Sequence, residues 1–153
     1  MGATHLDVYV DKIKLNNQSE AICALNCRYK DGVDGEQKRT GVTDSFPVGQ
    51  NKTLDLNSLP ELNELYNKGR EVYVTAYVDV KAGKDDYADI WVKYKPNSEK
   101  GVEFTISRVI NFTNTRVNGS VYVTKYFLPT RLYCRQTLPD TRLLQKKKAV
   151  WQI

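Results

Sequence analysis

The chain has 153 residues, of which 41% are hydrophobic and 27% charged, and its formal net charge is +5. This size and composition are typical of one globular domain with its own hydrophobic core, so we predict a single domain over residues 1–153. No apolar run approaches the roughly 20 residues that a membrane-spanning helix requires. The first seven residues lack the basic and apolar regions of a signal peptide, so we expect a cytoplasmic protein, with secretion by another route left open.

The first third of the chain alternates between apolar and polar residues, which predicts β-strands. Residues 6–10 carry an apolar side chain at every second position, and residues 13–15 continue this alternation in the opposite phase. A β-bulge near residues 11–12 would join the two halves into one strand. A second strand is predicted over residues 21–29, followed by a turn-rich loop over residues 30–36 with two Asp-Gly pairs.

One short helix is predicted near residues 58–68, after a polar edge strand over residues 37–45. Ser58 and Glu61 have the spacing of a capping box, with Ser58 at the N-cap. Gly69 has the residue type preferred just after a helix C-cap. The helix would bury one apolar face, formed by Leu59, Leu62, Leu65 and Tyr66.

The longest alternating stretch, residues 71–95, predicts a β-hairpin. Its apolar face is rich in valine, which indicates a core-facing surface. If Val80 pairs with Ala88, Tyr77 lies opposite Trp91. The other face is polar and aromatic, and consists of Glu71, Tyr73, Thr75, Tyr77, Asp79, Tyr87, Asp89, Trp91 and Lys93.

Two further strands are predicted over residues 102–112 and 121–126, joined by a tight turn at Asn118-Gly119. Closely spaced strands with one short helix indicate an all-β fold, an antiparallel β-sandwich of Ig-like or jelly-roll-like type. No alternation of strands with helices is present, which argues against a parallel nucleotide-binding sheet.

The three cysteines are expected to be reduced and mostly buried. Cys23 and Cys27 would lie on one face of a strand about 13 Å apart, too far for a disulfide. Their spacing also does not match paired zinc ligands. Free thiols agree with a reducing compartment, and whether Cys134 pairs stays open.

The segment of about residues 117–153 is strongly basic. From Arg116 onward the chain has eight basic residues and one acidic residue, Asp140. Such asymmetry indicates contact with an anionic partner, either nucleic acid or a charged surface. A solvated basic edge that opposes aggregation is the alternative. The predicted anion-binding residues are Arg131, Arg135, Lys146, Lys147 and Lys148.

Catalysis is not expected. His5 is the only histidine, and it lies near the start of the chain. The phosphate-binding, serine-hydrolase and zinc-protease motifs are absent. A pair of carboxylates acting on a glycosidic bond stays open, because the separation of acidic residues is invisible in a sequence.

A weak metal site is suggested by Asp85, Asp86 and Asp89, which cluster in one predicted loop. Ca²⁺ prefers carboxylate oxygens of this kind, although the spacing is not that of an EF-hand. Solvated acidic residues in a turn are the simpler alternative. No other cofactor is predicted.

The aromatic hairpin face suggests carbohydrate binding, because aromatic rings stack on sugars while polar neighbours bind the hydroxyl groups. The predicted ligand-binding residues are Tyr73, Tyr77, Tyr87, Asp89 and Trp91. The alternative is that another element or a second subunit covers this face. We therefore predict a non-enzymatic, lectin-like binding module that forms a homo-oligomer. The competing hypothesis is a structural or coat-like protein that binds nucleic acid through its basic C-terminal segment.

Overall fold

The computed structural model describes residues 3–81, 83–110 and 117–127. Within these ranges neither helix has the length and apolarity needed to cross a membrane. The elements are β1 (Thr4–Val10), β2 (Lys12–Asn17), β3 (Cys23–Asp31), β4 (Lys38–Val42), β5 (Asn51–Asp55), the 3₁₀-helix η1 (Leu56–Ser58), α1 (Pro60–Asn67), β6 (Val72–Val80), β7 (Asp86–Tyr87), β8 (Ile90–Tyr94), β9 (Gly101–Ile110) and β10 (Val117–Phe127).

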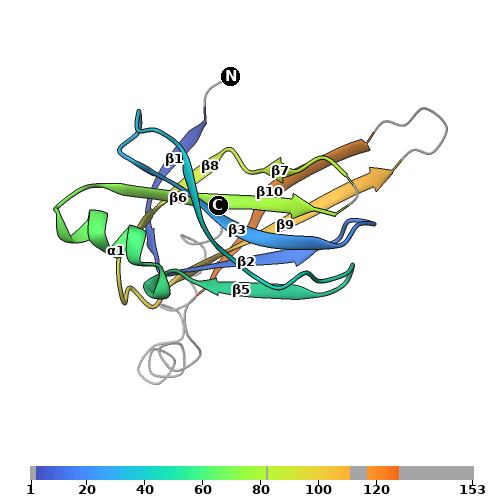
Figure 1. The fold of residues 1–153 in the computed structure, drawn as a ribbon, viewed down its shortest axis with the longest axis horizontal. Helices are drawn as coiled ribbons and strands as arrows, with labels where there is room; N and C mark the ends of the chain where they lie inside the picture. The colour runs from blue at the N-terminus through green and yellow to red at the C-terminus, as the bar shows by residue number, and fades with distance from the viewer. Residues whose placement is uncertain (1–2, 82, 111–116, 128–153) are drawn as a thin grey trace, which may run out of the picture.

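The strands form two mixed sheets (Figure 1). Sheet A has the order β1-β8-β6-β3-β4, with β7 also paired to β6, and sheet B has the order β10-β9-β2-β5. Most neighbours are antiparallel, but β1 pairs with β8 and β2 pairs with β9 in parallel. The prediction of a purely antiparallel arrangement is therefore wrong at these two pairs. The two parallel pairs have one cause. Residues 4–17 and residues 90–110 run side by side in the same direction, and each of these segments begins in sheet A and continues into sheet B.

The chain passes between the sheets at Asp11. Val10 is buried from sheet A, and Ile13 is buried from sheet B. Moving to the opposite sheet reverses the inward-facing side of a strand, which explains the change in hydrophobic phase. The predicted bulge within one strand is thus a switch of sheets. Asp11 is itself buried, and its carboxylate accepts hydrogen bonds from Asn57 Nδ2 at 3.1 Å and from the backbone N–H of Glu99 at 3.2 Å.

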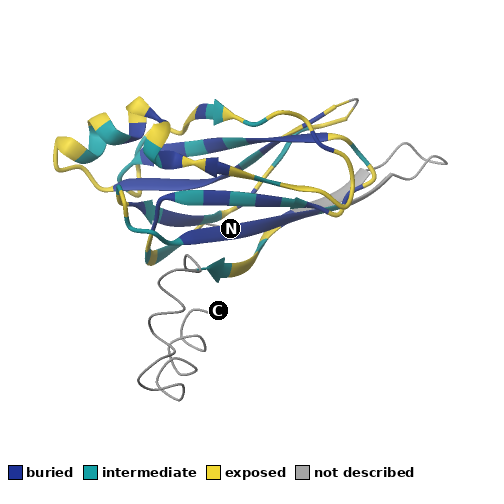
Figure 2. Ribbon diagram, turned by 90° about the horizontal axis from the view of Figure 1, so that it is seen from below, coloured by how far each residue is buried: buried dark blue, intermediate teal, exposed yellow. Residues whose placement is uncertain are grey.

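The core contains apolar side chains from both sheets and from α1, and Figure 2 shows the buried residues in the inner layers. The alternation predicted for β3 and β6 is confirmed, because their apolar positions are buried in this cluster. Cys23 and Cys27 are buried on the core side of β3. Burial raises the pKa of the Cys27 thiol far above its ordinary value, so it stays neutral. Cys134 lies outside the described residues.

Helix α1 is present, but the predicted capping box is wrong. The N-cap is Leu59, which makes no side-chain capping bond, and Pro60 is in the first turn. The Ser58 hydroxyl instead donates to the backbone carbonyl of Asp55 at 2.7 Å. Pro60 has no N–H to be capped and is preorganised for the first helical turn, which explains the one-residue shift. At the other end Gly69, with φ +77°, forms the predicted left-handed C-terminal cap.

The hairpin over residues 71–95 has a different register from the predicted one. Tyr73 pairs with Lys93, and Tyr77 pairs with Tyr87, so Tyr77 does not face Trp91. Two extra residues between β7 and β8 absorb the difference. Relative to the predicted pairing, β8 is shifted by two residues and β7 by four. Even shifts leave every side chain on its original face, so the alternation pattern is compatible with both registers.

The predicted tight turn at Asn118-Gly119 is also wrong. Asn118 pairs with Val109 and Gly119 pairs with Arg108, so both lie within the long antiparallel ladder of β9 and β10. Continuing the ladder past these residues adds backbone hydrogen bonds that a turn at this position would lose. The preference of Asn-Gly for turns is therefore overridden by strand pairing.

Candidate functional site

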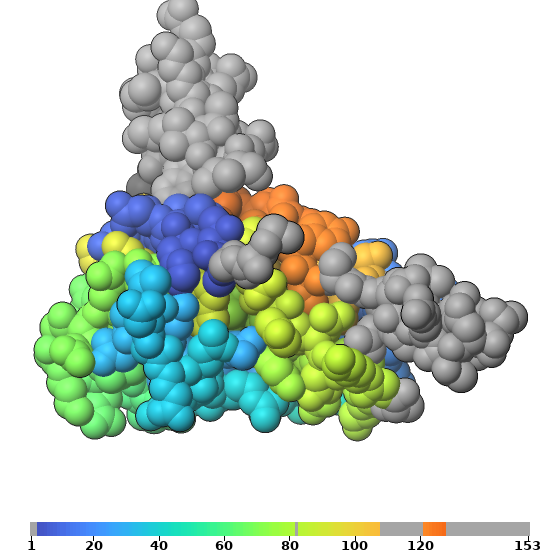
Figure 3. Space-filling model, turned by 90° about the horizontal axis from the view of Figure 1, so that it is seen from above, coloured from blue at the N-terminus to red at the C-terminus, as the bar shows by residue number. Residues whose placement is uncertain are grey.

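The outer face of sheet A, the side directed away from the core, is where the sequence places its ligand-binding residues. Figure 3 shows β1, the β3–β4 connection and the segment around β7 meeting on one side of the molecule. In this face the aromatic rings of β6, β7 and β8 alternate with cations from neighbouring strands. The cation–ring contacts join Arg28 to Tyr87, Lys30 to Trp91, Arg39 to Tyr77, and Lys93 to Tyr73.

Trp91 is covered by its own neighbours and is only 1% exposed. The Lys30 ammonium lies 4.3 Å from the centre of its ring, and the His5 ring is stacked parallel to it at 6.4 Å. Lys30 is itself only 4% exposed and lies 2.8 Å from His5 Nε2. Trp91 is therefore a packing residue in this structure, and its ring is not open to a ligand.

His5 and Lys30 stabilise each other as a neutral acceptor and a cationic donor. Burial and the Lys30 charge hold the pKa of His5 below its ordinary value. Burial also lowers the pKa of Lys30, an effect that the Asp34 charge opposes. A neutral imidazole accepts the lysine hydrogen bond, whereas a protonated one would repel the ammonium group.

The other predicted sugar-binding residues are only partly accessible. Tyr73 is buried and donates to Glu71 Oε1 at 2.9 Å, and Tyr77 donates to Asp85 Oδ2 at 2.9 Å. Tyr87 is 48% exposed, but the Arg28 guanidinium lies 4.3 Å from its ring centre. The side chain of Asp89 is exposed. The face is thus partly covered, by cations of the same chain.

The predicted metal ligands do not form a site. Asp85 caps a turn, since its Oδ1 accepts from the backbone N–H of Val80 at 3.0 Å and its Oδ2 accepts from Tyr77. Within the described part of the chain, no three acidic, histidine or cysteine side chains, Asp86 and Asp89 included, are grouped to hold a metal ion. The predicted anion-binding residues Arg131, Arg135, Lys146, Lys147 and Lys148 lie outside the described residues.

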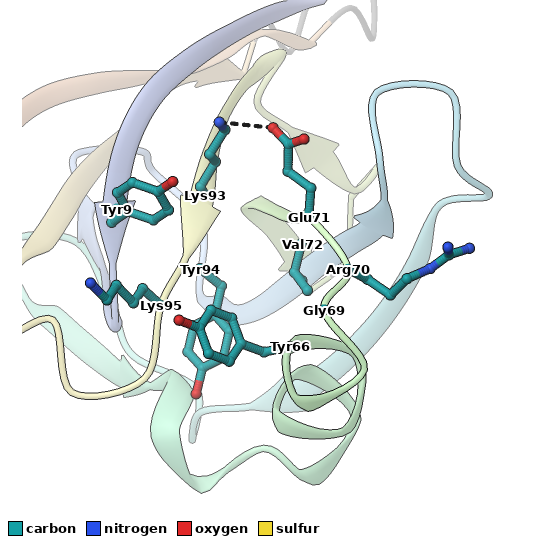
Figure 4. Close-up of a pocket in the computed structure, with 9 residues that line it drawn as sticks. All are labelled: Tyr9, Tyr66, Gly69, Arg70, Glu71, Val72, Lys93, Tyr94 and Lys95. Carbon is teal, nitrogen blue, oxygen red and sulfur yellow. Dashed lines mark ion pairs between the residues drawn. The ribbon is translucent and has the colours of Figure 1, made fainter.

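A pocket of about 380 Å³ lies beside this face, where β1, β8 and the segment after α1 meet (Figure 4). Sequence reasoning missed it because its residues come from three distant parts of the chain. The signals in the sequence are that Glu71 and Lys93 share the polar face of the predicted hairpin and that Lys93 and Lys95 share one side of a strand, but no pattern links them to Tyr9. The lining residues are Tyr9, Tyr66, Gly69, Arg70, Glu71, Val72, Lys93, Tyr94 and Lys95.

The mouth of the pocket combines an exposed ring with paired charges. Tyr9 is 42% exposed, and the ammonium groups of Lys93 and Lys95 lie 5.6 and 5.8 Å from its ring centre. Lys93 forms ion pairs with Glu71 at 2.8 Å and with Asp7 at 3.0 Å. The hydrogen bond that Lys93 donates to Glu71, and then the one that it donates to Asp7, raises the pKa of Lys93, while the same Lys93 contact lowers the pKa of Glu71.

The base of the pocket is aromatic. The rings of Tyr66 and Tyr94 meet edge to face with their centres 6.2 Å apart. Tyr94 is buried and donates a hydrogen bond to Asn63 Oδ1, and burial raises its pKa to about 12. At the rim Arg70 is paired with Asp31 at 2.8 Å. The pocket therefore offers ring surfaces, hydroxyl groups and charges that are largely compensated.

No protein-family model matches the chain, and no curated protein is significantly similar to it. The chemistry of the site therefore rests on the residues described above. An exposed tyrosine ring beside charged groups that are paired with one another suits a polar ligand with one apolar side and little net charge.

Proposed function

We propose that the protein is a non-enzymatic carbohydrate-binding module, built on a β-sandwich, and that its binding site is the pocket around Tyr9. The observation that carries this proposal is the half-exposed Tyr9 ring beside the Lys93–Glu71 ion pair. The predicted ligand class is unchanged from the sequence, but the site moves from the centre of the outer face to its margin.

The pocket supplies the two kinds of contact that a sugar needs. The apolar C–H side of a pyranose ring packs on the exposed surface of Tyr9. Lys93 and Lys95 donate hydrogen bonds to hydroxyl oxygens, while the Glu71 carboxylate accepts from hydroxyl groups. Because Lys93 is held between Asp7 and Glu71, these polar groups are already in place before a ligand arrives.

The test is a glycan array followed by titration calorimetry on any glycan that binds, at low and at moderate salt. We expect Tyr9→Ala to weaken binding by about tenfold, the loss of one ring contact, and Tyr9→Phe to retain it. Tyr122→Ala is the matched control, because Tyr122 on β10 is 43% exposed and lies outside the pocket. An array without binders, or equal affinity of the Tyr9→Ala and Tyr122→Ala proteins, would refute the proposal.

The competing hypothesis, a structural or coat-like protein that binds nucleic acid, depends on the basic C-terminal segment. It predicts nucleic-acid binding that weakens steeply with salt and disappears when residues 141–153 are deleted. The Tyr9→Ala protein would bind nucleic acid normally in that case. The two hypotheses therefore predict opposite results for the Tyr9→Ala variant and for the deletion of residues 141–153.

A further inference from the structure

A second set of side chains on the outer face, the double-arginine cluster, consists of Asn26, Arg28, Arg39, Tyr77 and Tyr87. Strand pairing brings them together: Arg28 of β3 lies directly opposite Arg39 of β4, and Asn26 of β3 lies opposite Tyr77 of β6. Tyr77 in turn lies opposite Tyr87 of β7. The cluster shares no residue with the pocket around Tyr9.

The two arginines are placed over a pair of stacked rings. The Tyr77 and Tyr87 rings are nearly parallel, with an angle of 3° and centres 6.4 Å apart. The Arg39 guanidinium lies 4.3 Å from the centre of Tyr77, and the Arg28 guanidinium lies 4.3 Å from the centre of Tyr87. These cation–π contacts orient both guanidinium groups while leaving the N–H donors at their edges available.

The arginines lack an anionic partner in the described residues. Neither guanidinium forms an ion pair or donates a side-chain hydrogen bond there. Like charges directly opposite each other in an antiparallel pair destabilise the sheet, and the single Asp85 carboxylate near Arg39 offsets only part of this repulsion. An anion bound between the two groups would remove it.

Asp85 is the neighbouring acidic group, but it forms no ion pair with either arginine. The Asp85 carboxylate is occupied by the N–H of Val80 and the hydroxyl of Tyr77. Burial opposes the ionisation of Asp85, but these hydrogen bonds, with the nearby Arg39 charge, lower its pKa below the ordinary value. Asn26 Nδ2 is buried and has no acceptor among the described residues. The cluster therefore has more hydrogen-bond donors than acceptors.

We propose that Asn26, Arg28 and Arg39 bind a tetrahedral oxyanion, a sulfate or phosphate ester carried by a larger ligand. Guanidinium groups bind such oxyanions through paired, charge-assisted hydrogen bonds, and the Asn26 amide supplies one more donor. The exposed part of Tyr87 packs against the group that carries the ester. This site does not depend on the function proposed for the pocket.

The test uses nuclear magnetic resonance of the arginine Nε–H groups during separate titrations with inorganic sulfate, inorganic phosphate, phenyl sulfate and phenyl phosphate. Chloride keeps the ionic strength constant. We expect saturable shifts of the Arg28 and Arg39 signals, with tighter binding of a phenyl ester than of its inorganic anion. Stronger binding of the sulfate compounds identifies a sulfate ester as the ligand, and stronger binding of the phosphate compounds identifies a phosphate ester.

Three variants test whether the arginines form a specific oxyanion site or attract anions only through their positive charge. Arg39→Gln removes one guanidinium, and Arg39→Lys keeps the charge but loses the paired donors, so both are expected to weaken binding by about tenfold. Lys68→Gln is the control, because Lys68 is an exposed cation at the C-terminal end of α1 that is paired with Glu64 and lies outside both sites. Shifts that do not saturate, or equal affinities for the Arg39→Gln and Lys68→Gln proteins, would overturn the proposal.

Discussion

Replacing Trp91 by alanine distinguishes a packing role of this ring from a ligand-binding role. The ring is 1% exposed and lies against both Lys30 and His5, which also contact each other. Truncation of a fully buried tryptophan costs about 3–5 kcal/mol. Loss of the cation–π contact with Lys30 adds about 1–2 kcal/mol, because that ammonium stays buried with fewer partners.

This loss is large compared with the whole stability of a domain, about 5–15 kcal/mol. We therefore expect Trp91→Ala to be strongly destabilised or unfolded. Trp91→Phe should be destabilised less, because it retains a ring beneath Lys30. Tyr87→Ala should lose no more than about 1 kcal/mol, since Tyr87 is half exposed.

The assay is urea denaturation followed by circular dichroism, which gives the free energy of unfolding of each variant. Glycan binding of each folded variant is measured in parallel. If Trp91→Ala loses less than about 1 kcal/mol, a loss typical of exposed positions, the ring is not packed as described and the reasoning fails. A Trp91→Phe protein that is stable but binds no glycan would return the ligand site to the centre of the outer face.

Three further predictions follow from other parts of the structure. Because the pKa of His5 is lowered in the folded protein, the unfolded chain binds the proton more tightly, and stability should fall as the pH drops below about 6.5. Urea titrations from pH 8 to pH 5 measure this loss, which should be smaller in His5→Gln. Gly41→Ala should cost about 1–3 kcal/mol, since φ is +71° and the new Cβ would lie 2.9 Å from Leu59 Cδ2; thermal unfolding measures it. In a Cys134→Ser protein, Cys23 and Cys27 should react with a thiol reagent only as fast as the protein unfolds, because both are buried.

Each of these predictions has a result that contradicts it. The same pH dependence in the wild type and in His5→Gln would show that the His5–Lys30 contact does not control acid stability. An unchanged melting temperature for Gly41→Ala would mean that residue 41 does not need its left-handed conformation. Rapid labelling of the native Cys134→Ser protein would show that the core side of β3 is accessible.

Local patterns in the sequence determined which side of β3 and of β6 faces the core. The alternation in β3 and β6 places the cysteines and valines in the core, because successive side chains of a strand point to opposite sides. Gly69 marks the end of α1 for an equally local reason, since its φ of +77° is strained for other residues. The short helix, the edge position of β4 and the burial of the two β3 cysteines follow from the same kind of information.

Only the tertiary structure decided which strands pair and which polar groups meet. The switch of sheets at Asp11 and the burial of Trp91 beneath Lys30 depend on partners far away in the chain. The pocket around Tyr9 and the pairing of Arg28 with Arg39 have the same origin. A periodic pattern specifies a face but not its neighbours, because shifting a strand by two residues preserves the pattern and changes every contact.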